Sequence, residues 1–404
     1  MMNLTKAFLV TTLVGCLLGC QSTDASNDNF LREQGPGIED FGDRNGTALK
    51  AKMRDLLQYQ NSVVTMTQFG DSHTAADFFT GPLRELMQNK FGNAGIGWVT
   101  PMQVKGQRHA LMSWQPSNWE VMSSRNVNHL DFPMGGYVAK PLRKGSSLLA
   151  TLNQEELTRG MWNVRLMVKS TKPEAIAVED MKNRIRVSDG LLSRPSNGWQ
   201  MIDLLTYLPF KIDAIDESAE IGGMWLQRYQ KPGVILSGIG TNGAQQSIWN
   251  KWSPQWLDEL AATTSDLVIL EYGTNEAFND TLDEKEYRKN LHNSIQTVRK
   301  TLPNAAILLV GASDSIKNGN GTRECMDKQP PSYAQVKKIQ RAVAQSEGVL
   351  YWDWQKAMGG KCSMERWVSH DLGRPDLVHL SPKGYELSAK MLYKDLMKYF
   401  GLAP

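Results

Sequence analysis

Residues 62–73 read SVVTMTQFGDSH, and this stretch decides the fold. A short apolar run that stops at a glycine is typical of a buried strand in a parallel sheet. Four further apolar runs have the same form and also precede turn residues and a helical pattern; they span 233–238, 266–272, 305–311 and 347–353. This alternation of strands and helices predicts an α/β fold with a doubly wound parallel sheet.

The helical pattern is clearest in the last predicted helix. Ser381 is a suitable N-cap there, and Pro382 occupies the first helical position. Apolar side chains recur every three or four residues from Tyr385 to Tyr399, which is the pattern of a helix with one buried face. The expected helices are 80–91, 253–262, 284–301, 331–346 and 382–400.

Residues 98–232 break this alternation. They contain short apolar runs such as WNVRLMVKS and RIRVS, which are separated by Gly, Pro, Ser and Asn. Many short strands divided by turn residues are typical of an all-β module. We therefore expect a split α/β domain, residues 41–100 and 233–404, with an inserted β-rich domain at 101–232 that resembles a carbohydrate-binding module.

The composition agrees with two folded domains and excludes other classes of protein. A chain of 404 residues is long for one compact domain, and its 41% apolar residues can fill large cores. With 22% charged residues, wholesale disorder is not expected. The formal net charge is only +3 and there is no long basic run, so nucleic acid is not an expected partner.

The first twenty residues have the features of a leader. Lys6 precedes an apolar run from Ala7 to Leu18 that is too short for a comfortable membrane span. The run ends in LLGC, which resembles the lipobox of bacterial lipoproteins, so we expect residues 1–20 to be a signal peptide and Cys20 to carry lipid. Gln21, which follows the cysteine, indicates anchoring in the outer membrane. We expect residues 21–40 to form a tether. The alternative is an ordinary signal peptide with an incidental cysteine.

Two cysteines remain once the leader is set aside. Cys325 and Cys362 lie in glycine-rich segments, and an even pair in an oxidising compartment predicts a disulfide. A zinc site is the weaker interpretation, because no CxxC or HxxxH pattern accompanies them.

Ser72 follows the first predicted strand directly. In open α/β sheets, ligands bind beyond the carboxyl ends of the strands. Ser72 lies at such an end, ahead of a predicted helix whose N-terminus offers free N–H groups. This position favours a nucleophile, while the plain alternative is a serine that only caps the helix.

Three other polar motifs follow predicted strands or precede the last helix. The second strand ends in GIGTNGA at 238–244, where glycines allow the backbone to approach a ligand, or simply make a turn. Asn275 follows the third strand and could equally cap the next helix. Asp376 and His379 are spaced so that the carboxylate can orient the imidazole, although such a pair also occurs in metal or structural sites.

In their order along the chain, these motifs resemble the blocks of the SGNH (GDSL-like) hydrolase family. The matching blocks are GDSH with Ser72, TNGAQ with Gly243, GTNEA with Asn275 and DLVHLS with Asp376 and His379. Within the family, a long β insertion after GDSHTAADFFTGPLRELM is similar to that of the periplasmic peptidoglycan O-acetylesterases. The resemblance implies a flavodoxin-like hydrolase sheet.

The resemblance also implies a role for each residue. Ser72 would be the nucleophile and His379 its general base, held in the right tautomer by Asp376. The oxyanion hole would take its donors from the backbone N–H of Ser72, the backbone N–H of Gly243 and the side-chain amide of Asn275. Gly240 lies near enough to compete with Gly243 for this role. Neither a metal nor an organic cofactor is implied.

The function implied is that of a serine esterase that removes O-acetyl groups from peptidoglycan, at a MurNAc hydroxyl, through an acyl-enzyme. The expected partners are the O-acetylated glycan and, through the lipid anchor, the membrane on the periplasmic side. One alternative is acetyl transfer, or deacetylation of another envelope polysaccharide. Another is a non-catalytic glycan-binding lipoprotein, against which the complete set of motif residues argues.

The tryptophans divide into two groups. Trp249, Trp252 and Trp256 are spaced by three and four residues, which is more typical of a core than of a sugar platform. The insertion carries further tryptophans, of which one or two are candidates for stacking on sugar rings: Trp114, Trp119, Trp162, Trp199 and Trp225. We expect exposed aromatic residues of 101–232 to contribute to a glycan groove.

Overall fold

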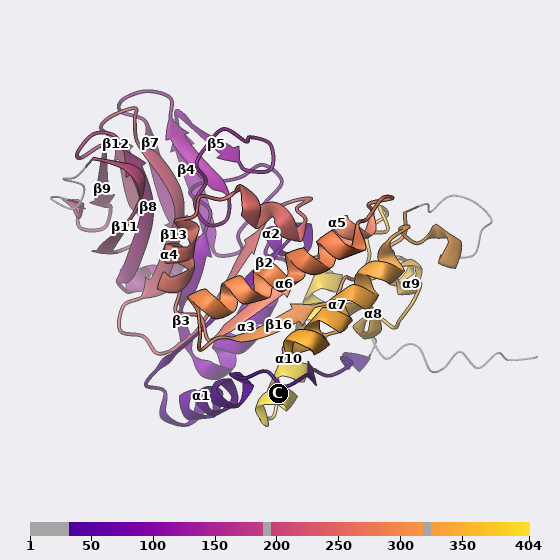
Figure 1. Cartoon of the computed structure of the whole chain (residues 1–404). Helices are drawn as coiled ribbons and strands as arrows, with labels where there is room; N and C mark the ends of the chain where they lie inside the picture. Colours follow the sequence, from indigo (N-terminus) through magenta and orange to yellow (C-terminus); the bar gives the residue numbers. More distant parts are fainter. Residues whose placement is uncertain (1–31, 189–194, 318–324) are drawn as a thin grey trace, which may run out of the picture.

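The computed structural model describes residues 32–188, 195–317 and 325–404 (Figure 1). Cys20, the leader and most of the expected tether lie outside the described residues. No helix in these three ranges is both long and apolar enough to cross a membrane.

Five parallel strands form the hydrolase part of the main sheet. Numbered by their order in the chain, they lie in the order 2-1-3-4-5, which is the flavodoxin-like arrangement. Each pairs in parallel register with its neighbour, as expected for continuous apolar runs buried on both faces. The strands are β2 (Val63–Gly70), β14 (Gly233–Gly240), β15 (Leu267–Glu271), β16 (Ala306–Val310) and β17 (Leu350–Trp352). The predicted doubly wound sheet is therefore confirmed.

Helices cover both faces of this sheet (Figure 1). One face packs against α1 (Gly46–Tyr59), α3 (Thr80–Phe91) and α10 (Pro382–Phe400). The other packs against α4 (Trp256–Ala262), α6 (Glu284–Thr301) and α7 (Tyr333–Glu347). The tryptophans at 249, 252 and 256 lie in the second of these cores, each only 6% exposed, so the spacing is that of a core.

The ends of α10 follow from its sequence. The Ser381 hydroxyl accepts the N–H of Gly384 at 3.2 Å, and Pro382 at the first turn needs no hydrogen bond of its own. The helix stops at Gly401, whose φ of +72° suits a glycine. The Ser381 hydroxyl also donates to the carbonyl oxygen of Asp371 at 2.7 Å, which ties the start of the helix to the preceding loop.

Helix α1 has no counterpart in the predicted pattern. Its first turn has no side-chain cap, and its buried stripe consists only of Gly46, Leu49, Met53 and Leu56. A polar helix with so narrow an apolar face gives a weak periodic signal, because tertiary packing rather than local propensity stabilises it.

The insertion continues the hydrolase sheet rather than forming a separate body. Strand β3 (Asn93–Val99) pairs in parallel with β14 on one side and antiparallel with β13 (Glu220–Arg228) on the other. Beyond β13 come β6 (Tyr137–Pro141) and β5 (Trp119–Ser123), while β8 (Trp162–Ser170) and β11 (Ser196–Thr206) branch from it. One sheet therefore runs through both parts of the molecule.

A second sheet of five strands packs over this extension. Its strand order is β10 (Ile185–Arg186), β9 (Ile176–Asp180), β12 (Phe210–Ala214), β7 (Ser147–Leu152) and β4 (Met112–Ser117). The two layers enclose an apolar core that includes Trp162, Leu166, Phe210 and Ile212. The all-β character predicted for the insertion is therefore confirmed, as a sandwich that uses the extended main sheet as one of its layers.

Residues 33–40, which we expected to belong to the tether, pack on the hydrolase part of the protein. Strand β1 (Glu39–Asp40) pairs with β17, and the N–H of Gly37 donates to Asp395 at 2.9 Å. Glu33 forms an ion pair with Lys394 at 2.8 Å. The assignment of residues 33–40 to a free tether is thus corrected, since their backbone and side-chain partners lie on the hydrolase part.

The structure joins Cys325 to Cys362 by a disulfide. The bond connects η4 (Cys325–Lys328), which follows β16, with the start of α9 (Ser363–Ser369). The chain after α9 leads into the loop that carries Asp376 and His379, so the bond braces the approach to that loop.

Removal of this disulfide is expected to destabilise the protein substantially. The two cysteines are 37 residues apart, and closing a loop of that size is worth about 3–4 kcal/mol in the chain-entropy model. Urea unfolding should show that the Cys325→Ser/Cys362→Ser double variant has a free energy of unfolding lower than that of the oxidised wild type by this amount. Wild type unfolded in the presence of reductant should show the same loss. Equal midpoints for the variant and the oxidised protein would contradict the prediction.

Candidate active site

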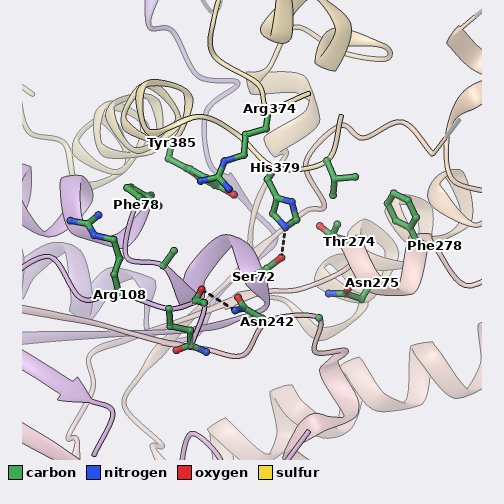
Figure 2. Close-up of a pocket in the computed structure, with 15 residues that line it drawn as sticks. Ser72, Phe78, Arg108, Asn242, Thr274, Asn275, Phe278, Arg374, His379 and Tyr385 are labelled. Carbon is green, nitrogen blue, oxygen red and sulfur yellow. Dashed lines mark hydrogen bonds between the residues drawn. The ribbon is translucent and has the colours of Figure 1, made fainter. Parts of the chain in front are cut away.

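Ser72 begins a short helix at the carboxyl end of β2. That helix, α2 (Ser72–Ala75), is capped by Asp71, whose carboxylate accepts the N–H of His73 at 2.9 Å. The Ser72 hydroxyl points away from the sheet and lies 2.9 Å from Nε2 of His379 (Figure 2). The strand end thus presents the hydroxyl to a histidine that is 307 positions distant in the chain.

His379 is held by its own loop, ahead of α10. Its Nδ1 lies 2.9 Å from Oδ2 of Asp376, while Oδ1 of Asp376 accepts the backbone N–H groups of His379 and Val378. Partial burial acts to raise the pKa of Asp376, but these hydrogen bonds outweigh it, and the pKa falls below its ordinary value. An ionised Asp376 places the proton of the neutral imidazole on Nδ1 and leaves Nε2 free to accept from Ser72.

Gly243 and Gly240 can be told apart by their surroundings. Gly243 lines the cleft beside Ser72 and has a φ of +68°, which favours glycine. Gly240 faces the interior, where an added Cβ would lie 2.4 Å from the backbone nitrogen of Ala75. In the described part of the chain, the N–H groups of Ser72 and Gly243 have no hydrogen-bond acceptor. Gly243 is therefore the better placed of the two glycines to donate into the cleft.

Asn275 lies on α5 (Thr274–Ala277) at the carboxyl end of β15. Its amide nitrogen donates to the carbonyl oxygen of Ala244 at 2.8 Å and to Asp71 at 3.3 Å. The bond to Ala244 ties the strand end of β15 to the Gly243 loop.

The cleft in front of Ser72 has a volume of about 730 Å³. Its aromatic walls are Phe78, Phe278 and Tyr385, which belong to the hydrolase part of the chain (Figure 2). The insertion contributes a loop with Gly106, Gln107 and Arg108. No group of three His, Cys, Asp or Glu side chains suited to a metal ion occurs among residues 32–188, 195–317 and 325–404.

The tryptophans of the insertion do not line this cleft. Trp114, Trp119, Trp162 and Trp199 are each at most 8% exposed, and Trp225 is half-buried. Among the described aromatic residues of 101–232, only Tyr229 is exposed, and it precedes the amino end of β14, opposite the site. The expected aromatic glycan groove on the insertion is therefore corrected. Trp114, Trp119 and Trp162 lie in the sandwich core, whereas Trp199 lies in the core that also holds α4, α6 and α7, and Trp225 packs against that core.

Comparisons with known proteins agree with this architecture. Residues 94–211 match the family described as peptidoglycan O-acetylesterase, N-terminal, and residues 219–387 match the GDSL-like lipase/acylhydrolase family. A solved peptidoglycan O-acetylesterase is 36% identical, with a TM-score of 0.81 over 90% of this chain and 99% of its own. The chain belongs to the peptidoglycan O-acetylesterase family. It is accordingly a carboxylic ester hydrolase.

Other solved structures are more distant from this O-acetylesterase family member. An acetyl xylan esterase is 19% identical over 40% of this chain and 80% of its own, with a TM-score of 0.32. A family two carbohydrate esterase from Cellvibrio japonicus is 13% identical over 72% of this chain and 98% of its own, with a TM-score of 0.29. Neither likeness bears on the function of the chain. A comparison with curated proteins gives no match.

A second histidine, His73, lies next to Ser72 in the chain. His73 is 1% exposed, and its Nδ1 lies 2.8 Å from the Tyr385 hydroxyl and its Nε2 3.3 Å from that of Ser313. Burial lowers the pKa of His73 to about 3, so this ring is uncharged at neutral pH. His73 therefore packs beneath the Ser72 loop and adds no charge beside His379.

Three buried carboxyl groups, those of Asp71, Glu271 and Glu276, lie near Ser72, and no role is predicted from the sequence for the last two. Glu271 accepts the Thr74 hydroxyl at 2.8 Å, and Glu276 accepts the N–H of Gln246 at 2.7 Å. Burial raises the pKa of Asp71 and Glu271, and it raises that of Glu276 to about 7. Burial thus disfavours negative charge on these carboxyl groups near Ser72.

Proposed function

We propose that this enzyme hydrolyses O-acetyl esters of peptidoglycan, at a MurNAc hydroxyl, with Ser72 as the nucleophile. The observation that carries the proposal is the continuous hydrogen-bond chain from Ser72 through His379 to Asp376, which opens on a cleft large enough for a sugar. Membership of the O-acetylesterase family supports the glycan.

The first half-reaction transfers the acetyl group to the enzyme. Nε2 of His379 takes the hydroxyl proton of Ser72 as Oγ attacks the ester carbonyl. The tetrahedral intermediate then collapses, the C–O bond to the sugar breaks, and the sugar oxygen leaves with the proton held by His379. Acetyl-Ser72 and a free sugar hydroxyl result.

The second half-reaction consumes water. His379 removes a proton from a water molecule, whose oxygen attacks acetyl-Ser72, and the proton returns to Oγ as acetate leaves. In both steps the oxyanion faces the N–H groups of Ser72 and Gly243 and the amide of Asn275. Donors placed in advance in this way stabilise charge that develops only in the transition state.

Acetate release tests this function. The purified chain should release acetate from O-acetylated peptidoglycan faster than from acetylated xylan or acetylated alginate. Acetyl transfer to an added glycan acceptor at the expense of acetate would identify a transferase instead. Binding of peptidoglycan without any ester hydrolysis would leave the non-catalytic alternative.

We further propose that Cys20 carries a lipid that anchors the enzyme to the outer membrane on the periplasmic side, where its substrate lies. The LLGC motif at 17–20 and Gln21 support this placement. A Cys20→Ala variant is expected to move from the membrane fraction to the soluble periplasmic fraction. Unchanged fractionation of that variant would argue against the anchor.

Replacing Asn275 by alanine is expected to lower kcat by about 10²–10³ with little change in KM, because the amide acts mainly in the transition state. The measurement is the steady-state hydrolysis of p-nitrophenyl acetate by folded variant protein. A higher KM at an unchanged kcat would instead assign Asn275 to substrate binding. Asn279→Ala is a suitable control, since that residue lies just beyond α5 and does not line the cleft.

A further inference from the structure

The charges that line the cleft are of one sign. Among its described lining residues, Arg108 and Arg374 are the permanently charged ones, and none is acidic. No ion pair to either guanidinium occurs in the described part of the chain, although the net charge of the whole chain is only +3. In Figure 2 the two arginines lie on one side of Ser72, and Asn275 and Phe278 lie on the other. The cleft thus has a basic side and an oxyanion side.

Arg374 belongs to the catalytic loop itself. Its N–H donates to the carbonyl oxygen of His379 at 2.8 Å, and its own carbonyl oxygen accepts the N–H of Leu377 at 3.0 Å. Figure 2 shows its guanidinium beside Tyr385, above the cleft. These backbone hydrogen bonds therefore fix the position of the Arg374 Cα atom relative to His379.

Arg108 comes from the insertion and reaches the same side of the cleft. Its guanidinium lies over the ring of Phe78, 4.5 Å from the ring centroid. Such stacking holds a guanidinium plane while leaving its N–H edge available to an acceptor. The loop is also tied to the Gly243 segment, because Asn242 donates to the carbonyl oxygen of Gly106 at 3.1 Å (Figure 2).

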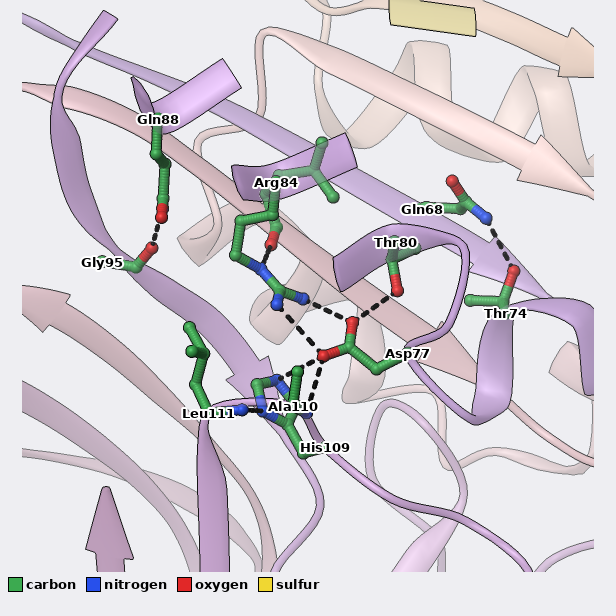
Figure 3. Close-up of polar contacts among 11 residues, drawn as sticks. Gln68, Thr74, Asp77, Thr80, Arg84, Gln88, Gly95, His109, Ala110 and Leu111 are labelled. Atoms are coloured by element: carbon green, nitrogen blue, oxygen red, sulfur yellow. Dashed lines mark hydrogen bonds and ion pairs between the residues drawn. The ribbon is translucent and has the colours of Figure 1, made fainter. Parts of the chain in front are cut away.

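A buried ion pair anchors the Arg108 loop to the nucleophile helix region (Figure 3). Asp77 pairs with Arg84 at 2.7 Å, and both side chains are at most 5% exposed. The same carboxylate accepts the N–H of Ala110 at 2.9 Å, two residues beyond Arg108. Breaking a buried pair of this kind is costly, so the loop has a defined position.

Asp77 is fully engaged by this anchor. Burial acts to raise its pKa, but the neighbouring charges and hydrogen bonds, chiefly those of Arg84, together outweigh burial and hold the pKa of Asp77 well below its ordinary value. Asp77 is therefore ionised and already paired with Arg84. Arg108 lines the cleft and, among the described residues, forms no ion pair.

We propose that Arg108 and Arg374 bind a carboxylate carried by the acetylated sugar unit, and so select acetylated glycans that are acidic next to the ester. The inference rests on the proposed function. The O3 ether of MurNAc ends in a carboxyl group, which is free where no stem peptide is attached, and the stem peptide carries carboxylates of its own. A neutral acetylated polysaccharide offers neither.

The chemistry of the two side chains fits this ligand. Guanidinium–carboxylate pairs form two parallel charge-assisted hydrogen bonds, which give direction as well as attraction. Because the cleft is open to solvent, salt screens the attraction, and the contribution falls as ionic strength rises. The pair acts on the sugar rather than on the reacting carbonyl, so its effect belongs mainly to KM.

A matched pair of substrates isolates the carboxylate. One is O-acetylated glycan free of peptide, and the other is the same glycan with its carboxyl groups converted to methylamides. The ratio of the two kcat/KM values is expected to be about 10–100 in favour of the free carboxylate, as for hydrogen bonds to charged groups. The ratio should fall between low and high salt.

Variants then assign the preference to the arginines. Arg108→Gln and Arg374→Gln should each lower the ratio about tenfold or to unity, and both should flatten its dependence on salt. Arg143→Gln is the matched control, because Arg143 is an exposed arginine of the insertion that does not line the cleft. Its ratio should equal that of wild type.

Peptide-bearing glycan identifies the source of the carboxylate. If the free ether-linked group is recognised, the peptide-bearing glycan behaves like the methylamide. If the stem peptide supplies it, the peptide-bearing glycan is processed well until its own carboxyl groups are blocked. Both results support a carboxylate subsite.

Equal kcat/KM values of wild type on the free and methylamide glycans would overturn the inference. An unchanged preference in both arginine variants would do the same. Failure of the proposed function is a different result, since the enzyme would then release no acetate from any of these glycans while still hydrolysing p-nitrophenyl acetate.

Discussion

Replacement of Ser72 by alanine is expected to lower kcat for ester hydrolysis by about 10⁶, the scale seen when a triad nucleophile is removed. The variant keeps the cleft and the oxyanion donors, but no oxygen remains within reach of Nε2 of His379 to attack the ester. Hydrolysis of p-nitrophenyl acetate measures the loss, and circular dichroism checks that the fold is unchanged. In wild type, a sulfonyl fluoride should label Ser72.

Ser315→Ala provides a matched control for this change. The Ser315 hydroxyl is buried, it has no hydrogen-bond partner in the described part of the chain, and it does not line the cleft. Its loss should leave kcat near the wild-type value. Full activity in folded Ser72→Ala would falsify the assignment of the nucleophile.

Asp376→Asn is expected to lower kcat by about 10⁴, with the shape of the loop preserved. The new amide can still accept the backbone N–H groups of Val378 and His379 through its oxygen. Its nitrogen, however, donates toward Nδ1 of His379 and favours the tautomer with the proton on Nε2. A histidine in that tautomer donates to Ser72 instead of accepting from it, so the general base is lost.

Asp371→Asn separates this effect from a general loss of charge in the loop. Asp371 is exposed, lies five residues before Asp376, and has a φ of +58° that asparagine tolerates. Steady-state kinetics should show the large loss in Asp376→Asn alone. A loss of less than tenfold there would mean that the imidazole is oriented by something other than Asp376.

The hydrolase sheet could be predicted because its strands carry a local signal. Buried parallel strands are continuous apolar runs, and β2, β14, β15 and β16 each lie within about a residue or two of their predicted positions. The continuity of the sheet into the insertion could not be predicted. β13 pairs with both β3 and β8, and such long-range pairing leaves no mark in the local pattern.

Part of the candidate site could be predicted for the same reason. Ser72, Asn275 and the Asp376/His379 pair stand in motifs next to predicted elements, and the structure brings them to one cleft. Glu271 and Arg108 stand in no such motif, and only the folded chain shows that Glu271 is buried near Ser72 and that Arg108 lines the cleft. Exposure of the insertion's tryptophans was mispredicted, since composition does not tell which face of a strand is covered.

The shared sheet gives the insertion a part in keeping the enzyme soluble. β3 is paired on one side by β14 and on the other by β13, so its backbone N–H and C=O groups are covered. A shortened enzyme made of residues 41–100 and 233–404 alone would present that side of β3 as an open edge. Open edges recruit strands from neighbouring chains, so we expect excision of the insertion to leave an enzyme that is prone to aggregate.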